Sequence, residues 1–194
     1  NIGVLAHDCF KYVPNLVTLI IESNKVTTIH RHAFSFLADL TVLDLSRNLL
    51  DTLPDTVFAP MQKLKTLILS QNSFKAFTPL SFAGISRNLQ ELKISGNELI
   101  SIDGSLFQHL SNIRALSLSN NPGLIDFPNI SSLTELEGIS ISHTGISRIY
   151  ECDFKNLNKL SQLYWSGSPI VCDCNLKWLK DWYHTNMSLD VRQK

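Results

Sequence analysis

The chain has 194 residues, of which 44% are hydrophobic and 18% charged, and its 17 acidic residues balance its 17 basic ones. This is the composition of a folded protein, and zero formal charge leaves no basic footprint for nucleic acid or an anionic membrane. No apolar run approaches the ~20 residues of a membrane-spanning helix, so we expect neither a nucleic-acid partner nor direct membrane insertion.

Residues 1–15 match only the second half of a repeat that becomes explicit further along the chain. Leu5, Phe10 and Val13 have the repeat spacing, with no strand pattern before them. We expect a partial leading repeat here, so that the first full strand, near Leu16, lies at an open sheet edge. Asn1 is not preceded by a secretory leader, so such a leader is expected to have been removed or to lie upstream.

Residues 16–171 consist of one repeated unit, with six full copies and a last one. The pattern is LxxLxLxxNxL, and its copies recur at intervals of 23–25 residues. The copies begin at Leu16, Leu40, Leu64, Leu89, Ile113, Leu136 and Leu160. Seven consecutive copies at a nearly fixed period predict a solenoid.

The LxL core of each unit predicts a short strand with leucines inward and intervening residues outward. Such a strand cannot bury its apolar face alone, whereas stacked copies form a parallel sheet with strands ~4.8 Å apart. An asparagine at the ninth position is expected to satisfy backbone groups where the chain turns. A phenylalanine ladder should fill the wider convex side, giving an α/β solenoid: a curved horseshoe with a concave sheet. The asparagines are Asn24, Asn48, Asn72, Asn97 and Asn121, and the phenylalanines are Phe10, Phe34, Phe58, Phe82, Phe107 and Phe154.

Repeats five to seven depart from this pattern. Repeat five has the insertion Asn121-Pro122-Gly123 and a shortened convex segment, 127–130, that drops the ladder phenylalanine. Thr144 and Ser168 replace the asparagine in the last two repeats, where we expect weaker versions of the same hydrogen bond.

Residues 172–194 predict a short helical C-terminal cap. Asp173 or Asn175 can cap the helix, and Trp178 with Trp182 form one of two apolar pairs at i,i+4 spacing. Such a helix covers the last core layer of a solenoid. Trp165, in the last strand, is expected to pack beneath it.

The repeats resemble the extracellular leucine-rich-repeat family, and the segment from Pro169 to Trp182 resembles its cysteine-rich C-terminal flank. Slit, the Toll receptors, peroxidasin and LRIG-type ectodomains carry such a flank. The resemblance implies that Cys172 and Cys174 form disulfides with later cysteines, which this chain lacks, so we expect a truncated cap. A disulfide between Cys152 and either of these cysteines is an alternative. Cys9, which aligns with Ala33, is expected to be a small buried thiol.

Two sequons, at Asn129 and Asn186, lie outside the predicted strands. Together with the flank they favour an oxidising, extracellular compartment and N-glycosylation.

Catalytic motifs are not found in the sequence: it has no glycine-rich phosphate loop, HExxH or GxSxG. We therefore expect no enzyme activity and no cofactor. A zinc site formed by Cys172, Cys174 and His184 has suitable ligands, but the flank favours disulfides, and we expect no metal.

The outward strand positions are the candidate partner-binding surface. The first four repeats combine apolar residues with charges there, as protein interfaces do. The candidate residues are Ile20, Glu22, Val42, Asp44, Arg47, Ile68, Gln71, Glu91, Lys93 and Tyr164. We expect an extracellular recognition module of a receptor or of a secreted guidance or matrix protein, with a protein or glycoprotein ligand. The alternatives are an intracellular scaffold and an accessory repeat domain of a larger enzyme such as a peroxidasin.

Overall fold

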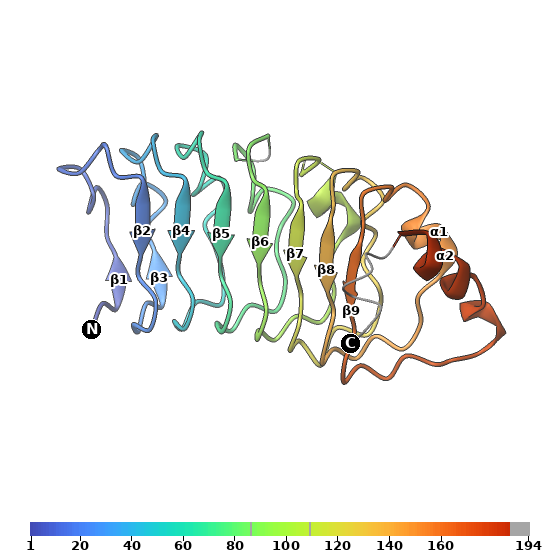
Figure 1. Ribbon diagram of the computed structural model, residues 1–194. Helices are drawn as coiled ribbons and strands as arrows, with labels where there is room; N and C mark the ends of the chain where they lie inside the picture. Colours follow the sequence, from blue (N-terminus) through green and yellow to red (C-terminus); the bar gives the residue numbers. More distant parts are fainter. Residues whose placement is uncertain (86, 109, 187–194) are drawn as a thin grey trace.

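The computed structural model describes residues 1–85, 87–108 and 110–186. Consecutive repeats stack into a curved solenoid, and their strands lie side by side in one seven-stranded sheet (Figure 1). The strands are β2 (Thr18–Ile20), β4 (Val42–Asp44), β5 (Thr66–Ile68), β6 (Glu91–Lys93), β7 (Ala115–Ser117), β8 (Gly138–Ser140) and β9 (Gln162–Tyr164). Every neighbouring pair is parallel. The predicted leucine-rich-repeat horseshoe with a parallel sheet is therefore confirmed.

The register of the sheet follows the repeat. The middle residues of the strands face one another, as Leu43 faces Leu67 and Leu67 faces Leu92. All three are fully buried, whereas the strand residues on either side of them are only half-buried. Because side chains alternate between the faces of a strand, a slip by one residue would expose these leucines. The leucine spacing thus fixes the register.

The other elements are short and lie away from this sheet. A two-stranded parallel sheet that the sequence did not predict pairs β1 (Val4–Leu5) with β3 (Thr28–Ile29). The helical elements are η1 (Gly104–Phe107), α1 (Glu151–Phe154), η2 (Cys174–Leu176) and α2 (Trp178–Asn186). The convex side is otherwise built of turns, and the final helix α2 lies at the C-terminal end of the solenoid (Figure 1).

The predicted phenylalanine ladder fills the space behind the sheet. Phe34 stacks on Phe10 and on Phe58, with ring centroids 5.9 and 6.1 Å apart. In repeat five Ile130 is fully buried, as the ladder phenylalanines Phe58 and Phe107 are. The nearby Phe127 instead packs against Phe154 of the next repeat, with centroids 5.3 Å apart. The shortened segment therefore keeps the core filled with a different pair of side chains.

The asparagine ladder satisfies the buried backbone of the turn. Asn48 Nδ2 donates to the carbonyl oxygens of Ile21, Leu45 and Ser46 at 3.0–3.1 Å, and its Oδ1 accepts from the Val26 amide at 3.0 Å. Asn72, Asn97 and Asn121 repeat this arrangement. The structural role predicted for these residues is confirmed.

Hydroxyl groups replace the asparagine amide in the last two repeats. Thr144 Oγ1 and Ser168 Oγ donate to the same acceptor, the carbonyl oxygen of Ile141, at 2.8 and 2.7 Å. The Thr144 amide in turn donates to Ser168 Oγ at 3.0 Å. One hydroxyl makes fewer such bonds than one amide group, as the sequence indicated.

The N-terminal end of the core is only partly covered. β2 is the edge strand of the main sheet. Leu16, Leu19 and Phe10 are half-buried, although their equivalents one repeat further along the chain are fully buried. The expected buried thiol at Cys9 is wrong: Cys9 is exposed, in the first turn of the described chain.

The thiol of Cys9 nevertheless lies against the second turn. Its Sγ is 3.8 Å from the carbonyl oxygen of Ala33. Desolvation by this partial burial raises the pKa of Cys9, and the neighbouring Asp8 carboxylate raises it further. We therefore expect Cys9 to be a weaker nucleophile than a fully solvated thiol.

The C-terminal end is covered by α2 through aromatic side chains. Phe154 packs against Trp178 and Trp182, with ring centroids 5.2 and 5.8 Å away. Asp173 accepts a hydrogen bond from the Asn175 amide at 2.8 Å, which identifies Asp173 as the cap of η2. Phe154 is thus the ring that packs against the tryptophan pair. Trp165, which we expected to pack beneath the helix, is half-buried and packs against the core.

Candidate functional site

The concave sheet face carries two parallel rows of outward side chains. Because the strands are in register, Ile20, Asp44 and Ile68 occupy equivalent positions on consecutive strands, followed by Lys93. The second row contains Thr18, Val42, Thr66 and Glu91. Adjacent members of a row are about one strand spacing apart, ~4.8 Å. The structure therefore brings together the outward residues of the first four repeats that the sequence selected.

Most charges on this face are paired with each other. Arg47 Nη1 lies 3.3 Å from Glu22 Oε1, and Arg47 Nε donates to Gln71 Oε1 at 2.7 Å. Lys93 Nζ lies 2.7 Å from Glu91 Oε1. These pairs connect neighbouring repeats or neighbouring rows, and they hold long side chains in defined positions. Ordering of this kind before binding lowers the entropic cost of association.

The residue before each position of the asparagine ladder has a left-handed backbone conformation. The φ angles of Arg47 and Gln71 are both 55°. The same conformation recurs at Ser23, Gly96, Asn120, His143 and Gly167. This turn carries the Arg47 and Gln71 side chains at the end of the strand, so a repeated backbone feature positions two of the predicted binding residues.

The last three repeats present a smaller and uncharged version of the face. Ala115 and Gly138 take positions held by larger residues in the earlier repeats. Hydroxyls pair across repeats, as Ser119 Oγ and Ser140 Oγ do at 2.6 Å. Tyr164, a predicted binding residue, is 47% exposed on β9, well away from the N-terminal group.

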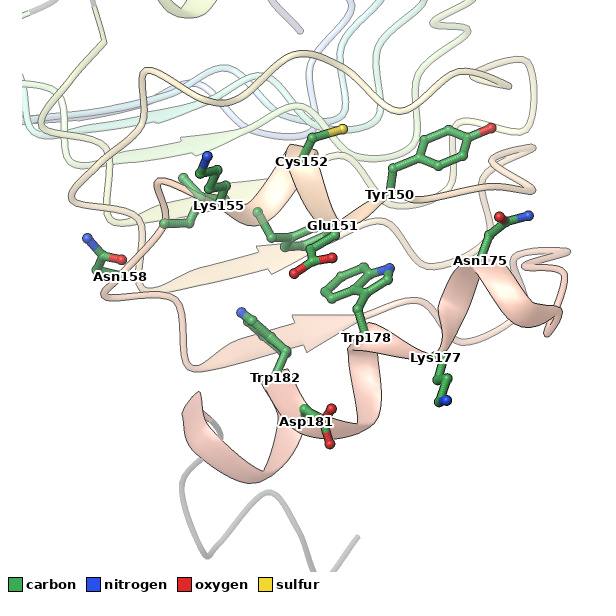
Figure 2. A pocket seen from close by; sticks show the side chains of 12 residues that line it. Tyr150, Glu151, Cys152, Lys155, Asn158, Asn175, Lys177, Trp178, Asp181 and Trp182 are labelled. Atoms are coloured by element: carbon green, nitrogen blue, oxygen red, sulfur yellow. The ribbon is translucent and has the colours of Figure 1, made fainter.

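A groove of about 1080 Å³ lies between the convex segment of repeat six and the cap. Its walls come from α1 and the residues beside it and from the segment 175–182, with Trp178 and Trp182 on one side and Glu151 on the other (Figure 2). The indole Nε1 of Trp178 is buried without a hydrogen-bond partner. Burial raises the pKa of Asp153, whose Oδ2 accepts a hydrogen bond from the Tyr150 amide at the start of α1. The groove was not predicted from the sequence, because it forms only where the cap meets the convex side.

A leucine-rich-repeat family model matches three consecutive segments, 1–50, 39–87 and 87–129. Together they span more than half of the chain. The chain belongs to the leucine-rich-repeat family.

Solved leucine-rich-repeat structures resemble the chain over most of its length. TLR13 in its complex with ssRNA13 is 26% identical, with a TM-score of 0.80 over 92% of this chain. The Toll–Spatzle complex of Drosophila gives 24% identity, a TM-score of 0.78 and 88% coverage. A Leptospira interrogans leucine-rich-repeat protein is 26% identical, with a TM-score of 0.72 over 81% of this chain.

This chain spans 25%, 24% and 39% of the lengths of those three proteins. Two of them form complexes with a partner, TLR13 with ssRNA13 and Toll with Spatzle.

The cysteines and the sequon at Asn129 of this leucine-rich-repeat chain lie outside the strands of the concave sheet. Cys152, Cys172 and Cys174 are exposed and unpaired in the described chain. Asn129 is exposed on the convex segment, where its Oδ1 accepts from Ser131 Oγ at 2.7 Å. The sequon at Asn186 continues into residues 187–188, outside the described residues.

The exposed imidazoles of His7, His30 and His32 gather on the first two turns, with ring centroids 5.0–5.6 Å apart. Within residues 1–85, 87–108 and 110–186, no group of three His, Cys, Asp or Glu side chains is suited to hold a metal ion. In the same residues, no helix has the length and apolar character to cross a bilayer.

Proposed function

We propose that the chain is a non-enzymatic recognition module that binds a protein or glycoprotein through the concave face of its first four repeats. The observation that carries this proposal is the row of Ile20, Asp44 and Ile68 on three consecutive strands, beside the ordered Arg47–Glu22 pair. Ile20 is 64% exposed. Apolar side chains surrounded by ordered polar ones are the composition that buried interface centres favour.

The rigidity of the sheet supports the same proposal. Strands β4, β5 and β6 are held on both sides by neighbouring repeats, and the fully buried Leu43, Leu67 and Leu92 behind them fix their positions. The edge strand β2 is held on one side, by β4. A partner that binds this surface has little backbone to order, so more of its contact energy becomes affinity. Toll, whose structure is similar to this chain, forms a complex with Spatzle.

We further propose an extracellular location, within a receptor or a secreted guidance or matrix protein. Support comes from the flank-like segment with Cys172 and Cys174 and from the exposed sequon at Asn129. In this proposal Cys172 and Cys174 form disulfides in the complete flank, and glycans on Asn129 and Asn186 leave the concave face open. Secretion from cultured animal cells tests it, since Asn129→Gln should then lose a glycan, as judged by endoglycosidase digestion.

The binding test begins with ligand capture on an array of extracellular proteins. Ile20→Asp is then compared with Ile100→Asp, because the two isoleucines are 64% and 61% exposed and only Ile20 lies on the sheet. We expect Ile20→Asp to weaken binding at least about tenfold, because it puts a charge at the apolar centre. Ile100→Asp should leave binding unchanged, and circular dichroism should show both variants folded.

The contrary result has a defined form. If Ile20→Asp and Ile68→Asp bind normally while a convex variant such as His32→Glu does not, the partner binds elsewhere. A parallel array of RNA and DNA tests for a nucleic-acid partner, because TLR13 forms a complex with ssRNA13. Preferential capture of nucleic acid would overturn the protein-ligand proposal. An intracellular scaffold would instead leave Asn129 unglycosylated. An accessory domain of an enzyme such as a peroxidasin would be linked to a catalytic activity.

A further inference from the structure

Asp44 differs from the other charged residues of the concave face because its charge has no counterion. Arg47 is paired with Glu22, and Lys93 is paired with Glu91. Glu91 Oε2 also accepts a hydrogen bond from Thr66 Oγ1 at 3.3 Å. Among the described residues, no ion pair involves the Asp44 carboxylate.

The residues on either side of Asp44 in its row are apolar. On the neighbouring strands its equivalents are Ile20 and Ile68, and Val42 lies two residues before it on its own strand. These four outward positions belong to β2, β4 and β5, which lie side by side in the sheet (Figure 1). The carboxylate thus lies at the middle of the apolar group that a partner on this face would cover.

The carboxylate is also held in a fixed orientation. Asp44 Oδ1 accepts a hydrogen bond from the Ser46 amide at 2.8 Å. One carboxylate oxygen is therefore engaged by the backbone of its own turn, while the other has acceptor capacity for an incoming donor. A charged group that is already oriented loses little freedom when it binds.

Covering an unpaired carboxylate is unfavourable, because it loses hydration and gains nothing in return. A neutral or acidic partner surface laid over Ile20 and Ile68 would meet this penalty, whereas a lysine or arginine would remove it. The desolvation cost of Asp44 disfavours partners without a basic group, and the ion pair with a lysine or arginine favours partners that have one. The paired charges around Asp44 give no comparable discrimination, since each already has its counterion.

We propose that Asp44 is the specificity-determining residue of the concave face, and that the partner is a protein whose contact segment places a basic side chain between apolar ones. This inference rests on the concave binding proposed above and adds the chemistry of the partner. The apolar residues of the segment contact Ile20 and Ile68, and its ammonium or guanidinium group pairs with Asp44.

A phage-displayed random-peptide library on the folded 194-residue chain provides a probe that needs no known ligand. Clones that also bind an Ile20→Asp, Ile68→Asp double variant are removed first, so that the remaining clones depend on the concave face. We expect these clones to be enriched in a lysine or arginine flanked by apolar residues. Their affinity should fall about tenfold or more on Asp44→Asn, the loss typical of removing one member of a covered charge pair.

Asp44→Asn keeps an oxygen for the Ser46 amide, so the turn is preserved and only the charge is lost. Asp51→Asn is the matched control, since Asp51 is an exposed acid of the same repeat that lies beyond the strand and its turn. Replacing the basic residue of a clone by glutamate should restore its binding to an Asp44→Lys variant.

The outcomes separate the two proposals. Concave-dependent clones that lack a basic residue, or that bind Asp44→Asn as tightly as the unchanged chain, overturn the role of Asp44 and leave the concave site standing. If selection yields binders but every one tolerates the double variant, the concave site itself is overturned, together with the inference built on it.

Discussion

At the scale of single residues, the asparagine ladder shows how one side chain serves two repeats. Asn72 Nδ2 donates to Leu69 in its own turn and to Leu45 in the preceding one, both at 3.1 Å, and its Oδ1 accepts from the Leu50 amide at 3.0 Å. These backbone groups are buried, so they have no water to replace a missing partner. The residue therefore contributes to the cohesion of repeats as well as to its own turn.

We predict that Asn72→Ala lowers the free energy of unfolding by about 2–4 kcal/mol, because several buried backbone groups lose their partner together. Urea denaturation followed by circular dichroism measures this change. Asn158→Ala is the control, since Asn158 is exposed, and it should shift the midpoint little. Coinciding midpoints for the two variants would mean that the ladder does not stabilise the fold.

At the scale of elements, the cap depends on aromatic packing. The helix α2 has nine residues, which is too short to be stable alone in water. Trp178 and Trp182 face each other at 6.4 Å between ring centroids, and Phe154 contacts both. One buried ring from repeat six thus holds the covering helix in place.

We predict that Phe154→Ala costs about 3–5 kcal/mol, the usual loss for a large buried ring, and detaches α2 from the solenoid. Tryptophan fluorescence should shift to longer wavelength before global unfolding, since Trp178 and Trp182 would become hydrated. Phe36→Ala removes a ring that is 36% exposed and should leave the emission unchanged. An unshifted spectrum for Phe154→Ala would show that other contacts hold the cap.

At the scale of the whole molecule, burial depends on the place of a repeat in the stack. Leu19 and Leu92 occupy equivalent positions in repeats one and four, but Leu19 is half-buried and Leu92 is fully buried. In a solenoid each repeat is stabilised mainly by its immediate neighbours. An identical substitution should consequently have a different cost at the end of the stack and at its centre.

We predict that Leu92→Ala costs about 2–5 kcal/mol through lost burial and a residual cavity, and that Leu19→Ala costs clearly less. Ser117→Ala, on the outward face of β7, should change stability little. Urea midpoints of the three variants, measured at one fixed redox state of the thiols, decide the order. Similar losses for Leu19→Ala and Leu92→Ala would contradict the dependence on position.

From the sequence alone we could predict the repeat period, the strands, the inward leucines, the phenylalanine ladder and the role of Asn48 and its equivalents. These features depend on local spacing, because each is set within one unit and copied in the next. The outward positions of the first four repeats were predictable for the same reason, since alternation along a strand assigns the faces.

The contacts between repeats and the burial at the ends of the stack became known only from the fold. No local pattern connects the residues that meet in the Arg47–Gln71 contact, in the packing of Phe127 on Phe154, in the β1–β3 sheet or in the groove beside α2. Cys9, in the first turn of the described chain, is exposed, although its equivalent Ala33 is buried. A periodic sequence specifies the inside of each repeat, whereas burial and charge pairing depend on the neighbour that the fold supplies.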